Sequence, residues 1–339
     1  MIGASANRKD HLMAQGQGKL SMASEQTMSV TFASQAMTRG RGILAIAGVA
    51  LRLVFRRKIF WVFYGLAACH FLSYFFGVYV TAQLREAVRQ QQEQIRLLPF
   101  MRAANPEQML QVFVGRLGLG GQPSMYRNFL WLQGWIVVVI LALAGALLIG
   151  QDYQSGGITF YLSKAITPTD YLLGKLSAVA MVLLATTVVP ALGLYVQYGV
   201  LEGQDYFLEQ WRVPLGILVY GSVTTVVLGL LMLATAVWLK KTVPMVLVWL
   251  GVLVFTRTWS RLLVDLMNWS PRWRLLDVWN DLYLVGSQCL GVSASLPGRW
   301  PGRVAPQPDW REAAAVLLAV SLLCWWYVQR QLRAVEIVA

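Results

Sequence analysis

The sequence predicts an all-α membrane protein with six transmembrane helices and an N-terminal amphipathic helix in the membrane interface. Hydrophobic residues make up 57% of the 339 residues and charged residues only 13%, compared with about 25% charged residues in an average soluble domain. The mean hydropathy of +0.52 is more than one water-facing fold of this length can bury. The apolar runs are continuous and do not alternate in period two, which excludes a transmembrane β-barrel.

The chain before the first apolar run divides into two predicted segments. Residues 1–38 are rich in Met, Ser, Gln and Ala without a helical apolar stripe, so we expect a disordered tail. Over-extended translation is the alternative, given Met22, Met28 and Met37. Residues 39–58 predict an amphipathic helix in the interface; an early extension of the first span is the alternative. The apolar side of this helix carries Leu44, Ala47, Leu51, Val54 and Phe55, and the other side carries Arg41, Arg52 and Arg56.

Six apolar segments follow, each close to the ~20 residues that cross a bilayer as a helix. The predicted spans are 59–82, 129–150, 174–199, 213–239, 243–265 and 311–329, within a six-helix transmembrane domain of residues 59–330. Two connections are long, residues 84–128 and 266–310, and the first begins with a helical region from Arg85 to Ile95. The second contains Trp269, Trp273, Trp279, Trp300 and Trp310. Tryptophans there favour interfacial anchoring or re-entry, and a small cap on the spans is equally compatible.

Basic residues next to the spans predict the orientation. Arg56, Arg57 and Lys58 precede the first span, which puts the N-terminus in the cytoplasm. With six spans the C-terminus is cytoplasmic too, and 84–128 and 266–310 are external. All lysines then fall on the cytoplasmic side: Lys9, Lys19, Lys58, Lys164, Lys175, Lys240 and Lys241. The expected location is the cell (inner) membrane.

The cytoplasmic loop at residues 151–174 is predicted to have a defined structure. Gly156 and Gly157 let the chain turn sharply out of the second span, and residues 158–164 predict a short helix with an apolar side. Thr167, Pro168 and Asp170 predict a capped start of the next helix, with Thr167 as N-cap and Asp170 three residues later. A short apolar-faced helix between two spans is suited to docking a soluble partner.

This region resembles the loop of type-2 permeases of ATP-binding-cassette transporters. The similarity lies in Ser-Gly-Gly-Ile at 155–158, Tyr-Leu-Ser-Lys-Ala-Ile at 161–166 and Tyr-Leu-Leu-Gly-Lys at 171–175. Gln151 and Ala165 depart from the family's Glu and Pro. The resemblance also covers the interfacial helix and the six-span layout. It implies an exporter in which a coupling helix contacts a separate cytoplasmic ATP-binding subunit, and in which two permease copies form a homo- or heterodimer. The contact residues would be Gly156, Gly157, Phe160, Tyr161 and Lys164.

The chain carries no phosphate-binding loop of its own. Such a loop needs Gly-x-x-x-x-Gly-Lys-Ser/Thr, but Gly174-Lys175 has Thr169 in place of the first Gly and is followed by Leu176. We therefore expect no enzymatic activity and no cofactor in this chain, with ATP and Mg bound by the partner subunit. Paired carboxylates, a His-Glu-x-x-His segment and a Gly-x-Ser-x-Gly elbow are also missing from the sequence.

Ionisable residues inside the predicted spans have two interpretations. Arg257, Arg261 and Asp265 are four residues apart and share one helical face. They mark a pathway or interface, or Arg257 reaches the outer headgroups while Arg261 pairs with Asp265. His70 in the first span is a proton-relay element or, as we prefer, a hydrogen-bonded packing residue.

Charge and motif content separate the remaining function classes. The basic segment 39–58 is expected to bind anionic membrane lipids. It lacks the aromatic platforms or folded module of a nucleic-acid-binding protein, so no nucleic acid is expected. A non-transporting membrane scaffold or assembly protein is the alternative to the transporter. A secondary transporter would show inverted repeats and midplane ionisable groups, and neither is found.

Overall fold

The computed structural model describes residues 40–95, 114, 118–145, 152, 167–294 and 305–338. The predicted N-terminal tail, 1–38, lies outside the described residues, as do parts of both long connections. Within the described ranges helix is the only regular secondary structure, and six helices are long and apolar enough to span a membrane. The predicted fold class, an all-α membrane protein with six transmembrane helices, is confirmed.

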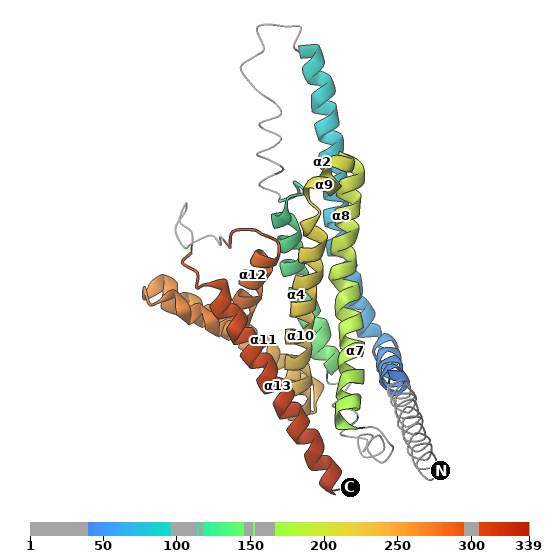
Figure 1. The fold of residues 1–339 in the computed structure, drawn as a ribbon, viewed down its shortest axis with the longest axis vertical. Helices are drawn as coiled ribbons and strands as arrows, with labels where there is room; N and C mark the ends of the chain where they lie inside the picture. Colours follow the sequence, from blue (N-terminus) through green and yellow to red (C-terminus); the bar gives the residue numbers. More distant parts are fainter. Residues whose placement is uncertain are drawn as a thin grey trace, which may run out of the picture.

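The described chain consists of long helices joined by short ones (Figure 1). The elements in chain order are α2 (Lys58–Ile95), α4 (Pro123–Gly145), α7 (Pro168–Thr186), α8 (Val188–Glu202), α9 (Gln204–Glu209), α10 (Arg212–Leu239), α11 (Thr242–Arg261), the π-helix η3 (Leu262–Leu266), the 3-10 helix η4 (Pro271–Leu276), α12 (Val278–Cys289) and α13 (Trp310–Val338). The third span combines α7 and α8, and η3 extends α11.

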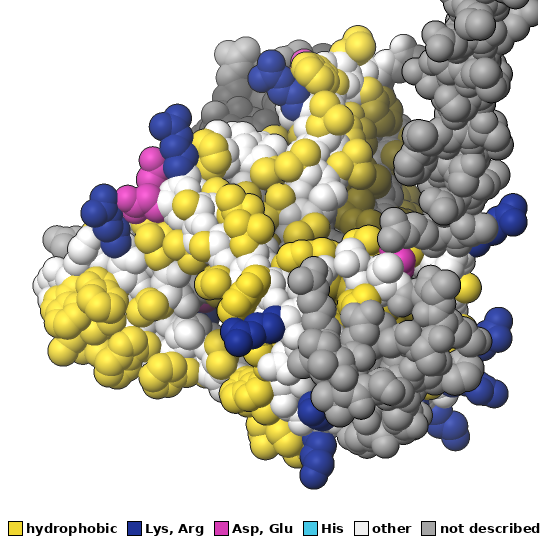
Figure 2. Space-filling model, turned by 60° about the horizontal axis from the view of Figure 1, so that its bottom comes forward, with side chains coloured by type: hydrophobic (Ala, Val, Ile, Leu, Met, Phe, Trp, Pro, Cys, Tyr) yellow, Lys and Arg dark blue, Asp and Glu magenta, His cyan; other side chains and the backbone are white. Residues whose placement is uncertain are grey.

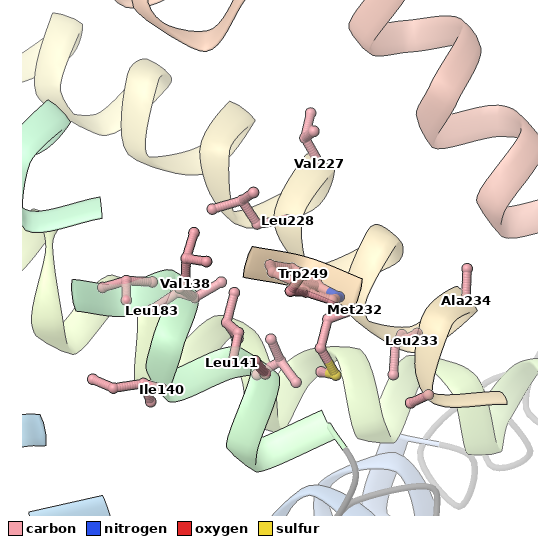
Figure 3. Close-up of a cluster of buried hydrophobic side chains, with 14 of the residues drawn as sticks. Val138, Ile140, Leu141, Leu183, Val227, Leu228, Met232, Leu233, Ala234 and Trp249 are labelled. Atoms are coloured by element: carbon pink, nitrogen blue, oxygen red, sulfur yellow. The ribbon is translucent and has the colours of Figure 1, made fainter. Parts of the chain in front are cut away.

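The main core lies where α4, α7, α10 and α11 meet (Figure 3). Large apolar side chains that these helices present to one another fill the space between them. The close-up labels Val138, Ile140 and Leu141 from α4, Leu183 from α7, Val227, Leu228, Met232 and Leu233 from α10, and Trp249 from α11. Trp249 also donates from Nε1 to Thr235 Oγ1 at 2.9 Å, so its polar atom is satisfied inside the membrane part.

A proline explains the break between α7 and α8. Pro190 has no N–H to donate to the carbonyl of Thr186 four residues earlier. Gln133 of α4 supplies the missing donor, Nε2 to Thr186 O at 2.8 Å. The Oε1 atom of the same side chain accepts from His70 Nδ1 of α2 at 2.5 Å. His70 therefore helps to hold a helix junction, a packing role consistent with the preferred sequence interpretation, and Gln133 joins three spans.

The first span, α2, packs less tightly than the others and continues far beyond the bilayer. Only 11% of its most apolar window is buried, compared with 67% for α4. Its 38 residues extend ~57 Å at ~1.5 Å per residue, nearly twice the ~30 Å hydrocarbon thickness. The predicted helical region after Arg85 is thus the continuation of the span itself. Arg85 Nη1 donates to Tyr198 Oη of α8 at 2.7 Å and also pairs with Glu202, which ties the two helices together.

The predicted interfacial segment forms a helix over residues 40–55, separated from α2 by a turn. Ile46, Ala47, Ala50 and Val54 are buried against the bundle. Apolar side chains on other sides of the helix are exposed, including Leu44 at 64%. A helix with apolar groups facing both protein and surroundings, and with exposed arginines, fits a position at the membrane surface.

The connection after α11 inserts into the bundle. Residues 279–287 of α12 are all buried, and α12 packs on α13 and α10 as well as on α11 and α4. Figure 1 shows α12 between α13 and the α4–α10 pair. Of the alternatives that the sequence left open for 266–310, the described part favours an inserted helix over a cap that rests on the spans. Trp279 is a core residue, 2% exposed, whereas Trp269 and Trp273 are exposed.

Candidate functional site

The predicted partner-contacting residues all lie outside the described residues: Gly156, Gly157, Phe160, Tyr161 and Lys164. The structure does describe the positions that bracket them, Asp152 on one side and Thr167 on the other. The candidate site is therefore built from the base of this loop, where it meets α7.

A buried ion pair fixes the first end of the loop. Lys175 Nζ of α7 lies 2.7 Å from Asp152 Oδ2, and the Lys175 side chain is only 3% exposed. The same carboxylate oxygen accepts from Tyr171 Oη at 2.7 Å. The ammonium of Lys175 also lies 5.5 Å from the centre of the Tyr171 ring. An ion pair taken out of water needs such additional partners to offset its desolvation, so Asp152 is held firmly against α7.

The second end of the loop carries the capping box that the sequence predicts. Thr167 Oγ1 accepts from Asp170 N at 3.2 Å and donates to Asp170 Oδ2 at 2.7 Å, while Thr167 N donates to the same carboxylate. Pro168 occupies the first helical turn, where its missing N–H costs nothing. The first turn of α7 is thus closed by its own side chains.

Both ends of the undescribed segment 153–166 are consequently attached to the first two turns of α7. Asp152 binds Tyr171 and Lys175, and Thr167 precedes the helix directly. A loop whose ends are held together has far less conformational freedom than one whose ends are separate. Force on the loop would act on the start of α7.

Two further elements meet α7 at this point. A Cβ on Gly174 would lie 2.7 Å from Ile46 Cγ2 and 3.1 Å from the carbonyl oxygen of Ile43, so the N-terminal helix approaches α7 as closely as glycine allows. On another side, Gln329 Nε2 of α13 donates to Thr169 Oγ1 at 3.3 Å. The start of α7 and the C-terminal end of α13 share the lower end of the molecule in Figure 1.

Basic side chains dominate this end of the described structure. Figure 2, which brings this end forward, shows many Lys and Arg side chains around the face and few acidic ones. Lys240 ends α10 with a left-handed backbone, φ 55°, and Lys241 follows it. The described basic residues near the ends of these helices are Arg52, Arg56, Arg57, Lys58, Lys240, Lys241 and Arg330. Such a rim fits contact with anionic headgroups.

The charged face of α11 differs from the expected arrangement. Asp265 Oδ1 accepts from Arg274 Nη2 at 2.6 Å, so the expected pairing of Asp265 with Arg261 is wrong. Arg261 is exposed. Arg257 turns toward α4, with its guanidinium carbon 5.1 Å from the ring centre of Trp131 and 5.3 Å from that of Trp135. The sequence does not reveal Arg274 as the partner of Asp265, because Arg274 belongs to η4, which folds back onto η3 only in three dimensions.

Two carboxyl groups on α12 form a second buried polar cluster. Asp277 is the N-cap, and its Oδ1 accepts from Trp279 N at 3.1 Å. Asp281, one turn later, is 0% exposed, and neither of its carboxyl oxygens has a partner among the described atoms. Burial, and secondarily the charge of Asp277, raises the pKa of Asp281 to about 9. Asp281 is therefore a neutral acid at pH 7.

Sequence reasoning missed the residues that hold the site together. The sequence patterns that contain Lys175 point to topology and to the permease-like loop, and no pattern pairs Lys175 with Asp152. A lysine two turns into an apolar span is a usable signal, because it requires a nearby acid. Gln133 in the second span is a similar signal. No group of three or more His, Cys, Asp or Glu side chains in the described ranges could hold a metal ion.

Comparison with known protein families and curated proteins identifies no match. No protein-family model matches the sequence, and no curated protein is significantly similar to it. The class that sequence and structure define is an all-helical, multi-pass membrane protein.

Proposed function

We propose that the chain is the membrane-spanning permease subunit of an ATP-binding-cassette exporter. In this proposal a separate cytoplasmic subunit binds ATP and Mg and hydrolyses the nucleotide, and the chain itself is not an enzyme. The protein lies in the cell membrane with both termini in the cytoplasm, and two permease copies, identical or different, enclose the path of a substrate.

The observation that carries the proposal is the attachment of both loop ends to the start of α7. A connection that served only to join two spans would not need a buried Lys175–Asp152 pair at one end and a capping box at the other. A docking element that transmits work needs such a base, because a slack connection would absorb the displacement. The resemblance of residues 155–175 to permease coupling loops points to the same role.

The contacts of α7 supply a route from the loop to the substrate path. The start of α7 touches the N-terminal helix at Gly174 and α13 at Thr169. It continues through the Thr187 junction into α8, so one nearly continuous element runs from the loop base to the opposite membrane surface. Nucleotide-driven closure of the ATP-binding subunits would move this element as a unit and reorient the spans. The equilibrium between the two orientations of the spans is shifted because the loop makes different contacts with the ATP-binding subunit in its two nucleotide states.

Co-purification tests the proposal. The tagged protein should co-purify with a subunit that binds ATP. Tyr161→Asp should abolish that association while membrane insertion stays normal, because it places a charge on the apolar side of the predicted loop helix. Trp211→Asp is the matched control. It places the same charge on an exposed aromatic residue, 55% exposed, at the start of α10, and should not affect association.

Normal association of the Tyr161→Asp protein with the ATP-binding subunit would overturn the proposed coupling role. A protein that never co-purifies with an ATP-binding subunit, and instead retains a partner bound to its external side, would favour the membrane scaffold. Such a partner would bind at the end of α2, where Gln83, Leu84, Glu86 and Ala87 are exposed.

A further inference from the structure

Two of the arginines around α12 are tied to acceptors. Arg127 of α4 is 7% exposed and donates from Nη1 to Ser293 O at 2.9 Å, and from Nε and Nη2 to Asn128 Oδ1. Its guanidinium carbon also lies 4.8 Å from the centre of the Tyr283 ring. Arg274 donates from Nη2 to Asp265. Both guanidinium groups therefore serve to connect elements of the fold.

Arg257 of α11 lacks such an acceptor. Within the part of the chain that the structure describes, its guanidinium makes no hydrogen bond and no ion pair, although it is held over Trp131 and Trp135. The side chain is only half-buried, so its N–H groups can be reached from outside the protein. Its neighbours along α11 are Phe255, Thr256, Thr258 and Trp259, none of which carries a carboxylate for these donors.

Aromatic rings form the walls next to this guanidinium. Trp135 lies 5.0 Å from Trp279 between ring centres, and Trp131 lies 6.2 Å from Tyr283. The tryptophans hold Arg257 by cation–π contacts and offer flat apolar surface beside it. The guanidinium edge, which carries the N–H donors in a fixed fork, suits an oxyanion.

The local charge balance is positive. Arg261 follows Arg257 by one turn. Of the nearby acids, Asp265 is paired with Arg274, and the Asp277 carboxyl, which accepts from Trp279 N as the N-cap of α12, interacts electrostatically with both Arg257 and Arg261. Asp281 is a neutral acid when the pH is below its pKa of about 9. An incoming anion would thus meet two cationic groups and one carboxyl group, Asp277, so the balance stays positive.

We propose that Arg257, with Trp131 and Trp135, binds the anionic headgroup of an amphiphile, a carboxylate, sulfate or phosphate that carries an apolar chain. The headgroup accepts hydrogen bonds from the guanidinium, and the chain lies against the tryptophans and the exposed apolar side of α11. If the proposed function holds, on which this further step rests, the exported substrate belongs to this chemical class. The amphiphile is either a phospholipid of the bilayer or a molecule that enters from solution.

Binding to the full-length protein in phosphatidylcholine nanodiscs tests the site without the ATP-binding subunit. The probe is a dansyl-labelled undecyl phosphate, and the matching undecanol derivative reports partitioning into the lipid. We expect saturable binding of the phosphate and only linear uptake of the alcohol. Arg257→Gln should weaken phosphate binding by about 10- to 100-fold, as the loss of hydrogen bonds to a charged group implies. Arg257→Lys should retain part of the affinity, because the charge remains and the fork is lost.

The matched control is Arg212→Gln. It removes an exposed arginine that also lies over a tryptophan, 5.3 Å from the ring centre of Trp211, but at the start of α10, and phosphate binding should be unchanged. Equal binding by the wild type and by an Arg257→Gln protein with unaltered thermal unfolding would overturn the site, as would saturable binding of the alcohol.

Adding phosphatidylglycerol to the nanodiscs identifies the source of the anion. Competition with the probe would identify a bilayer lipid as the ligand, and unchanged probe binding would identify a soluble amphiphile; both results require the site. Failure of the proposed function is recognised separately, by the absence of an ATP-binding subunit in the co-purification.

Discussion

Buried ionisable groups have complete partners at the start of α7 and incomplete ones around α12. Lys175 is surrounded by the Asp152 carboxylate and the Tyr171 ring, and the carboxylate in turn accepts from the tyrosine hydroxyl. Asp281 has no partner for either oxygen among the described residues, and Arg257 has aromatic contacts without an acceptor. Satisfied networks fix one geometry, so the loop base is suited to transmitting displacement. The unsatisfied groups around α12 are suited to accepting a ligand or a proton.

Breaking the loop-base network should have the largest effect on stability. Asp152→Ala leaves the Lys175 ammonium buried without a counter-charge, which costs about 3–5 kcal/mol of the free energy of unfolding. Unfolding by sodium dodecyl sulfate in mixed micelles would measure the loss. The double variant Asp152→Leu with Lys175→Met should regain most of it, because no unpaired charge remains. An Asp152→Ala protein as stable as the wild type would mean that the pair does not hold the loop.

Local features of the fold can be predicted from the sequence, whereas contacts between distant helices cannot. The six spans follow from the length and apolarity of each run, a local property, and the start of the third span at Pro168 follows from a local capping pattern. The Gln133 contact with Thr186 and the burial of α12 depend on which helices become neighbours. A single sequence does not encode neighbours in any local pattern, so the inserted position of α12 stayed one of several alternatives.

Replacing the ionisable carboxyl of Asp281 should stabilise the protein increasingly as the pH rises. The unfolded chain releases this proton near pH 4, and the folded protein only near its raised pKa of about 9. Between these values the folded state binds more protons, so wild-type stability falls as the pH rises. Asp281→Asn removes this dependence. The gain of the variant over the wild type in free energy of unfolding should grow by on the order of 2 kcal/mol from pH 5 to pH 8. This slope is smaller than the limiting ~1.4 kcal/mol for each pH unit, because water can reach the carboxyl group when α12 shifts.

Thermal unfolding of both proteins at several pH values would show the divergence. Asp205→Asn changes an exposed aspartate of α9 and should leave the pH profile parallel to that of the wild type. If the profiles of the wild type and Asp281→Asn are also parallel, Asp281 is ionised in the folded protein and the contrast between the two regions is lost.

Adding a methyl group at Gly174 should separate the N-terminal helix from α7. The new Cβ would lie 2.7 Å from Ile46 and 3.1 Å from the backbone oxygen of Ile43, which cannot rotate away. We expect Gly174→Ala to lose about 1–2 kcal/mol, since overpacking outweighs the better helix propensity of alanine. Gly251→Ala in α11, where a Cβ meets nothing within 4 Å, should be neutral or slightly stabilising in the same unfolding assay. Equal effects of the two substitutions would show that the helices are not in close contact at Gly174.

The smallest expected effect concerns the cap of α7. Thr167→Ala removes the side-chain acceptor for Asp170 N and the donor to its carboxylate, which costs about 1 kcal/mol. Thr167→Ser keeps both functions and should restore the stability. Because the loss is local, hydrogen exchange should accelerate in the first turn of α7 while the core around Leu183 stays protected. Acceleration that reaches Leu183 would mean that the cap supports the whole helix, and the loop base would then depend on Thr167 as strongly as on Lys175.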